Sequence, residues 1–201
     1  RAITLMNAVA IDMAMATGDD GWKARAAFLT PISKAFGSDV GCEVSATGIQ
    51  VHGGMGFIEE TGAAQYARDV RVATIYEGTN GIQAMDLVAR KLMDGGEAAF
   101  RILEEIEQGA EAAKASFPEL AEAVWQSAES LRETTEWLVA QDDLNNRFAG
   151  AVPYLRAFAR VLGAHVHLAS AIKGDEARTR LATFYIRRML PEHVGLLAHA
   201  R

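Results

Sequence analysis

The residues of this chain whose types and spacing could do chemistry are two glycine-rich turns and one carboxylate, all between Gln50 and Gln83. Gly53, Gly54 and Gly56 leave the main chain without side chains where the preceding helix must stop. A bulky polar ligand, such as one that carries phosphate, can therefore approach the backbone closely. The same spacing fits a plain C-terminal stop of a helix equally well, with Gln50 in its last turn.

The carboxylate is Glu77, which stands in the run Ile75-Tyr76-Glu77-Gly78-Thr79. An apolar pair on one side and a glycine on the other predict a carboxylate that is shielded from water. Such a group is suited to work as a general base. The alternative interpretation is an exposed glutamate in a loop.

Together these turns resemble the carboxy-terminal signature of the flavin-dependent acyl-CoA dehydrogenases. The resemblance covers residues 1–93 and is carried by Gln50, Gly53, Gly54, Gly56, Phe57, Arg68, Asp69 and residues 76–79. It implies that Glu77 removes the proton α to the thioester carbonyl of an acyl-CoA, while the β-hydrogen leaves as hydride to FAD. It also implies that the backbone N–H of Glu77 binds the thioester oxygen and stabilises the developing enolate. Tyr76 and Gly78, which flank the base, are assigned to the substrate.

The resemblance also assigns residues to the FAD cofactor. Gln50, Gly53 and Gly54 are expected to contact the FAD of a neighbouring subunit, and Thr79 the flavin of its own subunit. Gly81 is assigned to the cofactor as well, although it replaces a polar side chain that is frequent in the family. Gln65 stands where a basic residue is common.

This resemblance implies partners and leaves alternatives open. We expect an acyl-CoA substrate, an electron-transfer flavoprotein as electron acceptor, and a homo-oligomer, specifically a homodimer. An acyl-CoA oxidase would use the same base with oxygen as acceptor. A different class of interpretation is a helical assembly module that is catalytically silent. The family's amino-terminal helical domain and middle β-domain are not in this sequence, so we expect the chain to be part of a longer protein.

Composition narrows the classes of partner. The chain has 201 residues, 50% hydrophobic content and a formal net charge of -6, with no basic stripe, which argues against nucleic acid. No apolar run reaches the length of a membrane span. The single cysteine, Cys42, excludes an intrachain disulfide and indicates a reducing compartment. We expect a bacterial cytoplasm in preference to a mitochondrial matrix, and no metal site.

Hydrophobic spacing predicts an all-α fold. The first ninety-six residues, 1–96, are expected to form an acyl-CoA dehydrogenase C-terminal helical bundle, and 97–201 a second helical-bundle extension. Within the first part, Pro31 either starts or kinks a long helix, residues 61–66 form a short helix, and residues 70–76 are loop or extended. The glycine pair Gly95-Gly96 marks the boundary.

The extension is predicted to be an up-and-down bundle with helices that begin near Pro118, Pro153 and Pro191. Arg156 and Arg160 are expected on the outer face of one helix. The inner face of the next helix is expected to hold Leu181, Phe184, Tyr185 and Met189, and the acidic residues Glu104, Glu105 and Glu107 are expected to face solvent. Such an extension resembles the long-form acyl-CoA dehydrogenases, among them bacterial enzymes that act on methylthiopropanoyl-CoA.

Overall fold

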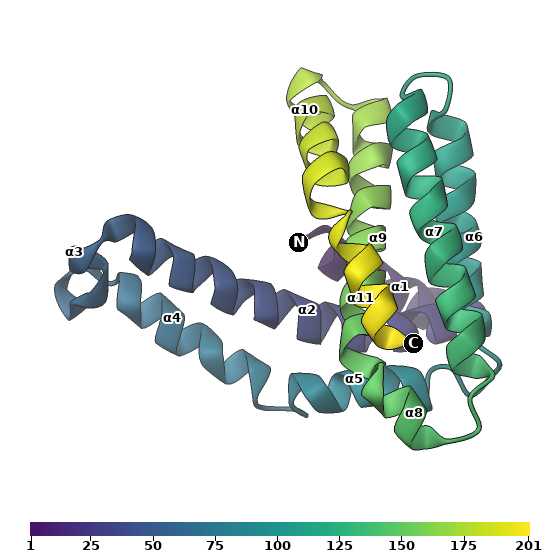
Figure 1. Ribbon diagram of the computed structural model, residues 1–201, viewed down its shortest axis with the longest axis horizontal. Helices are drawn as coiled ribbons and strands as arrows, with labels where there is room; N and C mark the ends of the chain where they lie inside the picture. Colours follow the sequence, from purple (N-terminus) through teal and green to yellow (C-terminus); the bar gives the residue numbers. More distant parts are fainter.

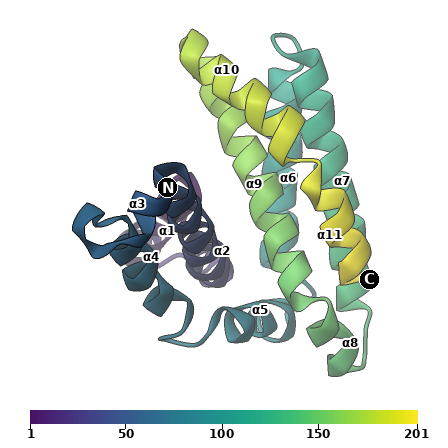
Figure 2. The same ribbon diagram turned by 60° about the vertical axis from the view of Figure 1, so that its left-hand side comes forward.

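The computed structural model describes residues 1–201, which form eleven α-helices and no strand. The expected all-α class is confirmed. Most helices lie in one bundle, and an arm extends away from it (Figures 1 and 2). None of the helices combines the length and the apolar character that crossing a membrane requires.

Two helices open the chain, α1 (Ala2–Thr17) and α2 (Asp20–His52). Gly18 ends α1 in the left-handed conformation, with φ 70°, and Asp19 caps α2 by accepting a hydrogen bond from the backbone N–H of Trp22 at 3.0 Å. Pro31 does not start the second helix, because α2 has already begun at Asp20 and continues through the proline.

The second half of α2 forms the arm, residues 40–74, together with α3 (Gly54–Phe57) and α4 (Ala63–Arg71) (Figure 1). The prediction that residues 70–76 are loop or extended is wrong for most of the segment, since α4 reaches Arg71 and a 3-10 turn spans Val72–Thr74. Val70 packs on α2 where Gly41 has no side chain; a Cβ at Gly41 would lie 2.8 Å from Val70 Cγ2. This contact outweighs the modest helix propensity of valine.

After the arm, α5 begins the return to the bundle, and the remaining helices build it. Their bounds are α5 (Asn80–Ala89), α6 (Glu97–Ala113), α7 (Pro118–Val139), α8 (Leu144–Ala149), α9 (Ala151–Lys173), α10 (Glu176–Phe184), a π-helix (Tyr185–Met189) and α11 (Glu192–Ala200). Pro118 lies in the first turn of α7 and Pro191 directly before α11, as predicted. The helix assigned to Pro153 begins two residues earlier, at Ala151.

One hydrophobic core joins the signature region to the extension. Phe28 of α2 meets Phe158 of α9 edge to face with ring centroids 5.0 Å apart, and Phe158 meets Tyr154 in the same way at 5.9 Å. All three side chains are fully or almost fully buried. The extension therefore packs directly on the helix that leads into the glycine turn.

Two faces of the extension differ from the prediction. Arg160 was expected to face outward, yet it is buried, at 7% exposure. Leu181 and Phe184 were expected to face inward, yet they are 52% and 58% exposed. Both residues belong to α10, and the side of α10 that faces the core carries Ala182. The core-facing residues are Ala182, Ile186 and Leu190.

The acidic residues of α6 also differ from the prediction of a solvated face. Glu105 pairs with Arg25 of α2, with 2.5 Å between Oε2 and Nη1, and Glu107 pairs with Arg132 of α7, with 2.6 Å between Oε1 and Nη2. Both carboxylates thus link helices, and only Glu104 remains fully on the exposed face.

Candidate active site

The glycine turn ends α2, and the backbone needs glycine at only some of its positions. Gly53 has φ 63° and ψ −147°, a combination that side-chain-bearing residues rarely adopt, and its N–H donates to the carbonyl of Gln50 at 3.1 Å. At Gly56 a Cβ would lie 2.3 Å from the carbonyl oxygen of Ile49, so no side chain fits. Gly54 is different: no atom lies within 4 Å of an added Cβ. The fold does not require a glycine there, and the backbone at Gly54 is open.

Glu77 lies in a strained turn between α4 and α5. With φ 53°, it is the only residue other than glycine in the left-handed region, and Gly78 follows it with φ 81°. The backbone N–H groups of Glu77, Gly78 and Thr79 donate to no acceptor within the chain. Successive free N–H groups in such a turn form a concave site that binds an anionic oxygen.

Side chains of α2 and α5 hold this turn in place. Lys34 Nζ donates to the carbonyl of Gly78 at 2.7 Å, and Gln83 Nε2 donates to the carbonyl of Glu77 at 3.0 Å. Thr79 caps α5, with its Oγ1 accepting from the N–H of Ile82 at 3.4 Å. The carbonyls of both left-handed residues, Glu77 and Gly78, are therefore held by hydrogen bonds.

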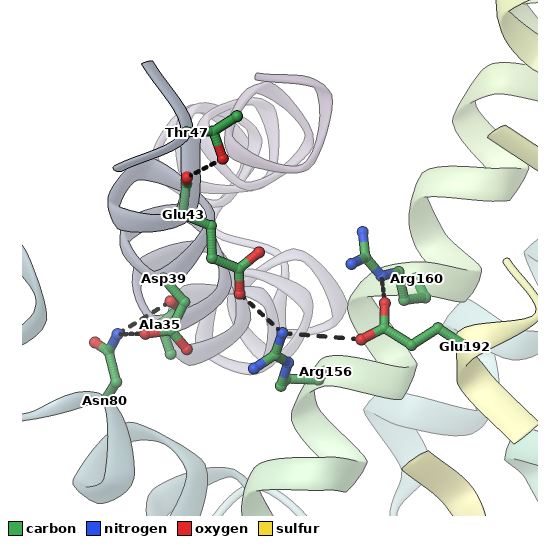
Figure 3. A network of polar contacts seen from close by, with 8 residues as sticks. All are labelled: Ala35, Asp39, Glu43, Thr47, Asn80, Arg156, Arg160 and Glu192. Carbon is green, nitrogen blue, oxygen red and sulfur yellow. Dashed lines mark hydrogen bonds and ion pairs between the residues drawn. The ribbon is translucent and has the colours of Figure 1, made fainter. Parts of the chain in front are cut away.

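Asn80, the first residue of α5, anchors the turn to α2. Its Nδ2 donates to the carbonyl of Ala35 at 3.1 Å and to Asp39 Oδ1 at 2.7 Å (Figure 3). The same amide group bonds Ser38 Oγ at 2.9 Å, and its Oδ1 accepts from Lys34 Nζ at 2.8 Å. Four groups on one face of α2 thus position a single amide side chain.

The carboxylate of Glu77 is exposed in this chain, and so are its neighbours Ile75 and Tyr76, each at 55%. The prediction that the apolar pair shields the acid is therefore wrong for the chain by itself, because both apolar side chains turn outward. Glu77 and Gly78 border an open groove of about 580 Å³, which Phe148 of α8 also lines.

The glycine turn and the Glu77 turn lie at opposite ends of α4 (Figure 1). The structure brings Tyr76, Glu77, Gly78, Thr79 and Gly81 together around the start of α5, and it keeps Gln50, Gly53 and Gly54 apart from them at the tip of the arm.

Two family models match the chain in sequence and together account for nearly all of it. Residues 1–93 match the acyl-CoA dehydrogenase C-terminal domain, and residues 102–201 match a domain described as acetyl-CoA dehydrogenase C-terminal like. The chain belongs to the acyl-CoA dehydrogenase family.

Individual relatives carry names of this acyl-CoA dehydrogenase family. The chain is 45% identical over 138 residues to the 3-methylmercaptopropionyl-CoA dehydrogenase of Ruegeria pomeroyi, covering 65% of this chain and 23% of that protein. It is 47% identical over 77 residues to a butyryl-CoA dehydrogenase of Syntrophomonas wolfei, covering 38% of this chain and 13% of that protein. It is 42% identical over 66 residues to the human mitochondrial very long-chain specific acyl-CoA dehydrogenase, covering 33% of this chain and 10% of that protein. The chain spans a quarter or less of the length of these relatives.

Two residues that hold the acyl-CoA dehydrogenase signature in place, Lys34 and Asn80, were not predicted from the sequence. A signal was available, because Lys34, Ser38 and Asp39 form a polar strip at helical spacing on an otherwise apolar stretch of α2. Arg68, which is part of the signature, forms an ion pair with Glu59 on the exposed surface, with 2.8 Å between Nη2 and Oε2.

Proposed function

We propose that this chain carries the base of an acyl-CoA dehydrogenase, in which Glu77 removes the α-proton of an acyl-CoA thioester and the product is the trans-2-enoyl-CoA. The observation that carries the proposal is the backbone of Glu77. A non-glycine residue in the left-handed region costs free energy, about 1–3 kcal/mol, and such strain concentrates at functional sites. Here it is maintained by hydrogen bonds from Lys34 and Gln83.

The same turn offers both groups that enolate chemistry needs. The carboxylate of Glu77 can take the α-proton, provided the carbon comes within about 3 Å. The free N–H of Glu77 can donate to the thioester oxygen as negative charge develops on it, with the free N–H of Gly78 next to it. Tyr76 and Gly78 flank this position and are proposed to contact the substrate. Hydrogen bonds from Lys34 and Gln83 hold the turn before substrate arrives, which lowers the cost of alignment during the reaction.

The residues assigned to FAD fit that cofactor. Gly54 leaves open backbone at the tip of the arm, and at Gly81 a Cβ would meet only Thr79 Oγ1, at 4.0 Å. Thr79 Oγ1 accepts a hydrogen bond from α5, and its hydroxyl proton remains free to donate. FAD, when bound, supplies the acceptor for the β-hydrogen.

The position of these residues also fits two different FAD molecules. Because the tip of the arm and the Glu77 turn lie at opposite ends of α4, we assign Gln50, Gly53 and Gly54 to the FAD of a neighbouring subunit. Thr79 and Gly81 are assigned to the FAD of their own subunit.

The remaining assignments follow from the family. We propose an acyl-CoA substrate, an electron-transfer flavoprotein as acceptor, and a bacterial cytoplasmic setting, which the Ruegeria and Syntrophomonas relatives support. The division of the chain at Gly96 and the homodimer stay predictions. Exposed apolar side chains on the arm support self-association; they include Val51, Met55, Phe57 and Tyr66. Light scattering on the complete enzyme should give a dimer, and a tetramer would contradict this.

The test is substitution of the base in the complete enzyme that contains this chain. Glu77→Gln should keep FAD and bind acyl-CoA, and its turnover with an electron-transfer flavoprotein or a dye should fall by at least roughly two orders of magnitude. Glu60→Gln, which changes an exposed glutamate of the arm in the same way, is the matched control and should keep full turnover. Equal activity of the two variants would exclude Glu77 as the base, and wild-type turnover with oxygen alone would indicate an oxidase.

A further inference from the structure

Arg160 is the one buried cationic side chain of the protein, and it lies between two helices. Its Nε is 2.5 Å from Glu192 Oε2 in the first turn of α11 (Figure 3). Its guanidinium lies 5.2 Å from the ring centroid of Phe36 on α2, within cation–π range. A buried charge needs such partners, because water no longer solvates it.

A second arginine extends this contact along α2. Arg156, one turn before Arg160 on α9, lies with its Nη2 3.1 Å from Glu43 Oε1 and 3.8 Å from Glu192 Oε1 (Figure 3). Glu192 thus joins both arginines. Together, α9 and α11 hold α2 at Phe36 and at Glu43, about two helical turns apart.

The stretch of α2 held in this way is the stretch that anchors the Glu77 turn. Lys34, Ala35, Ser38 and Asp39 bind Gly78 and Asn80, as described above, and Phe36 lies among them in sequence. Figure 3 shows Asn80 approaching α2 from one side and the two arginines from the other. This part of α2 therefore connects the extension to the turn, in addition to the direct packing of α5 on α9.

We infer that Arg160 is a positioning residue for the Glu77 turn and acts through Phe36 and α2; the inference rests on the proposed function. Removing the guanidinium takes from Glu192 its buried partner and from Phe36 its cation–π contact, so this part of α2 shifts or loosens. Lys34 and the anchors of Asn80 move with it. Because a misplacement of about 1 Å can slow an enzyme about a hundredfold, a small displacement is enough.

A different arginine of the extension, which does not contact α2, provides a matched control. Arg132 of α7 lies with its Nη2 2.6 Å from Glu107 Oε1 and its guanidinium 5.7 Å from the ring centroid of Phe100. Like Arg160 it has a close carboxylate partner and a phenylalanine ring, and Glu129 Oε1 lies 3.7 Å from its Nε. Its partners belong to α6 and α7, and none belongs to α2.

The first experiment measures amide hydrogen exchange in the 201-residue chain and does not depend on activity. Arg160→Met should speed exchange at the N–H of Gln83, which donates to the carbonyl of Thr79 at 3.0 Å, by about tenfold or more. Arg132→Met should leave that amide within about twofold of wild type. Arg160→Lys, which keeps a cation beside Glu192, should recover part of the protection. Equal exchange at Gln83 in Arg160→Met and Arg132→Met would overturn the inference.

The second experiment measures kinetics of the complete, FAD-loaded enzyme. Arg160→Met should lower kcat about tenfold or more with KM within about twofold, while Arg132→Met leaves both unchanged. If Arg160→Met does not fold, Phe36→Leu removes the ring while keeping an apolar side chain, and it should lower kcat in the same direction.

The two proposals fail in different ways. A wild-type enzyme without dehydrogenase activity, combined with faster exchange in Arg160→Met, would refute the proposed function and leave the link through α2 intact. Full kcat in Arg160→Met, combined with an inactive Glu77→Gln, would refute the positioning role and leave the proposed function intact.

Discussion

The two longest helices of the molecule, α9 and α2, differ in where their burial ends. Along α9 buried residues occur from Ala151 to Ala171, whereas along α2 they stop at Ala35, although the helix continues to His52. Beyond that point apolar side chains such as Val44 and Val51 are 64% and 80% exposed. The core therefore fixes α9 along its length. Beyond Ala35, specific contacts to Asn80, Val70 and Arg156 hold α2, and the candidate functional residues lie in or beside this less buried region.

The largest expected effect comes from replacing a phenylalanine in the buried helix α9, compared with replacing a phenylalanine on the exposed arm. Phe158→Ala in α9 removes a fully buried ring that packs on Phe28 and Tyr154, and it should lower the free energy of unfolding by about 3–5 kcal/mol. Phe57→Ala on the arm, where the ring is 80% exposed, should change it by less than about 0.5 kcal/mol. Urea unfolding of the 201-residue chain measures both. A loss of comparable size in Phe57→Ala would show that the arm shares the core.

A smaller effect separates the backbone role of the arm glycines from their cofactor role. Gly53→Ala forces alanine into a conformation that suits glycine, at a cost of about 1–3 kcal/mol, and should speed exchange of the Gly56 N–H, which bonds the Gly53 carbonyl. Gly54→Ala has open space and should leave that exchange unchanged. In the complete enzyme Gly54→Ala should instead lower FAD occupancy. Full FAD occupancy in Gly54→Ala would remove Gly54 from the cofactor site.

The smallest effect is a dependence of bundle stability on pH. His165 and the Arg25 guanidinium beside Glu105 lower the pKa of that carboxyl to about 2, against the opposing effect of its partial burial. Because the pKa is lower in the folded state than in the unfolded state, Glu105 stabilises the fold above the unfolded value, about 4.3. That contribution is lost as pH falls from there through about 2.

The matching measurement is the urea midpoint of wild type and Glu105→Gln at pH 6 and pH 3. The advantage of wild type should be clear at pH 6 and smaller at pH 3. Glu104→Gln, on the exposed face of the same helix, should differ little from wild type at either pH. A wild-type advantage that grows toward pH 3 would contradict the lowered pKa of Glu105.

Local sequence pattern predicted the features that depend on neighbours in the chain. The all-α class, the proline starts at Pro118 and Pro191 and the glycine-ended α2 all follow from capping and periodicity. Side-chain environments set by distant residues did not follow. Arg160 looked like a surface residue because its partners, Phe36 and Glu192, are far away in the sequence.

The candidate site shows the same division. The motif predicts Glu77 as the base, but it does not predict the left-handed φ of 53° or the hydrogen bond that Lys34, more than forty residues earlier, donates to the carbonyl of the next residue, Gly78. The expected shielding of Glu77 by Ile75 and Tyr76 failed, because adjacency in sequence does not fix which way side chains point. The π-helix at Tyr185–Met189 was likewise not predicted from the sequence.

The most direct test of the central claim follows the α-proton itself. The complete enzyme is incubated in D₂O with an acyl-CoA, and deuterium entering at the α-carbon is measured by mass spectrometry or proton NMR. Wild type and Glu60→Gln should exchange the α-hydrogens, and Glu77→Gln should exchange them at least about a hundredfold more slowly while retaining FAD. Exchange by Glu77→Gln at the wild-type rate would contradict the account.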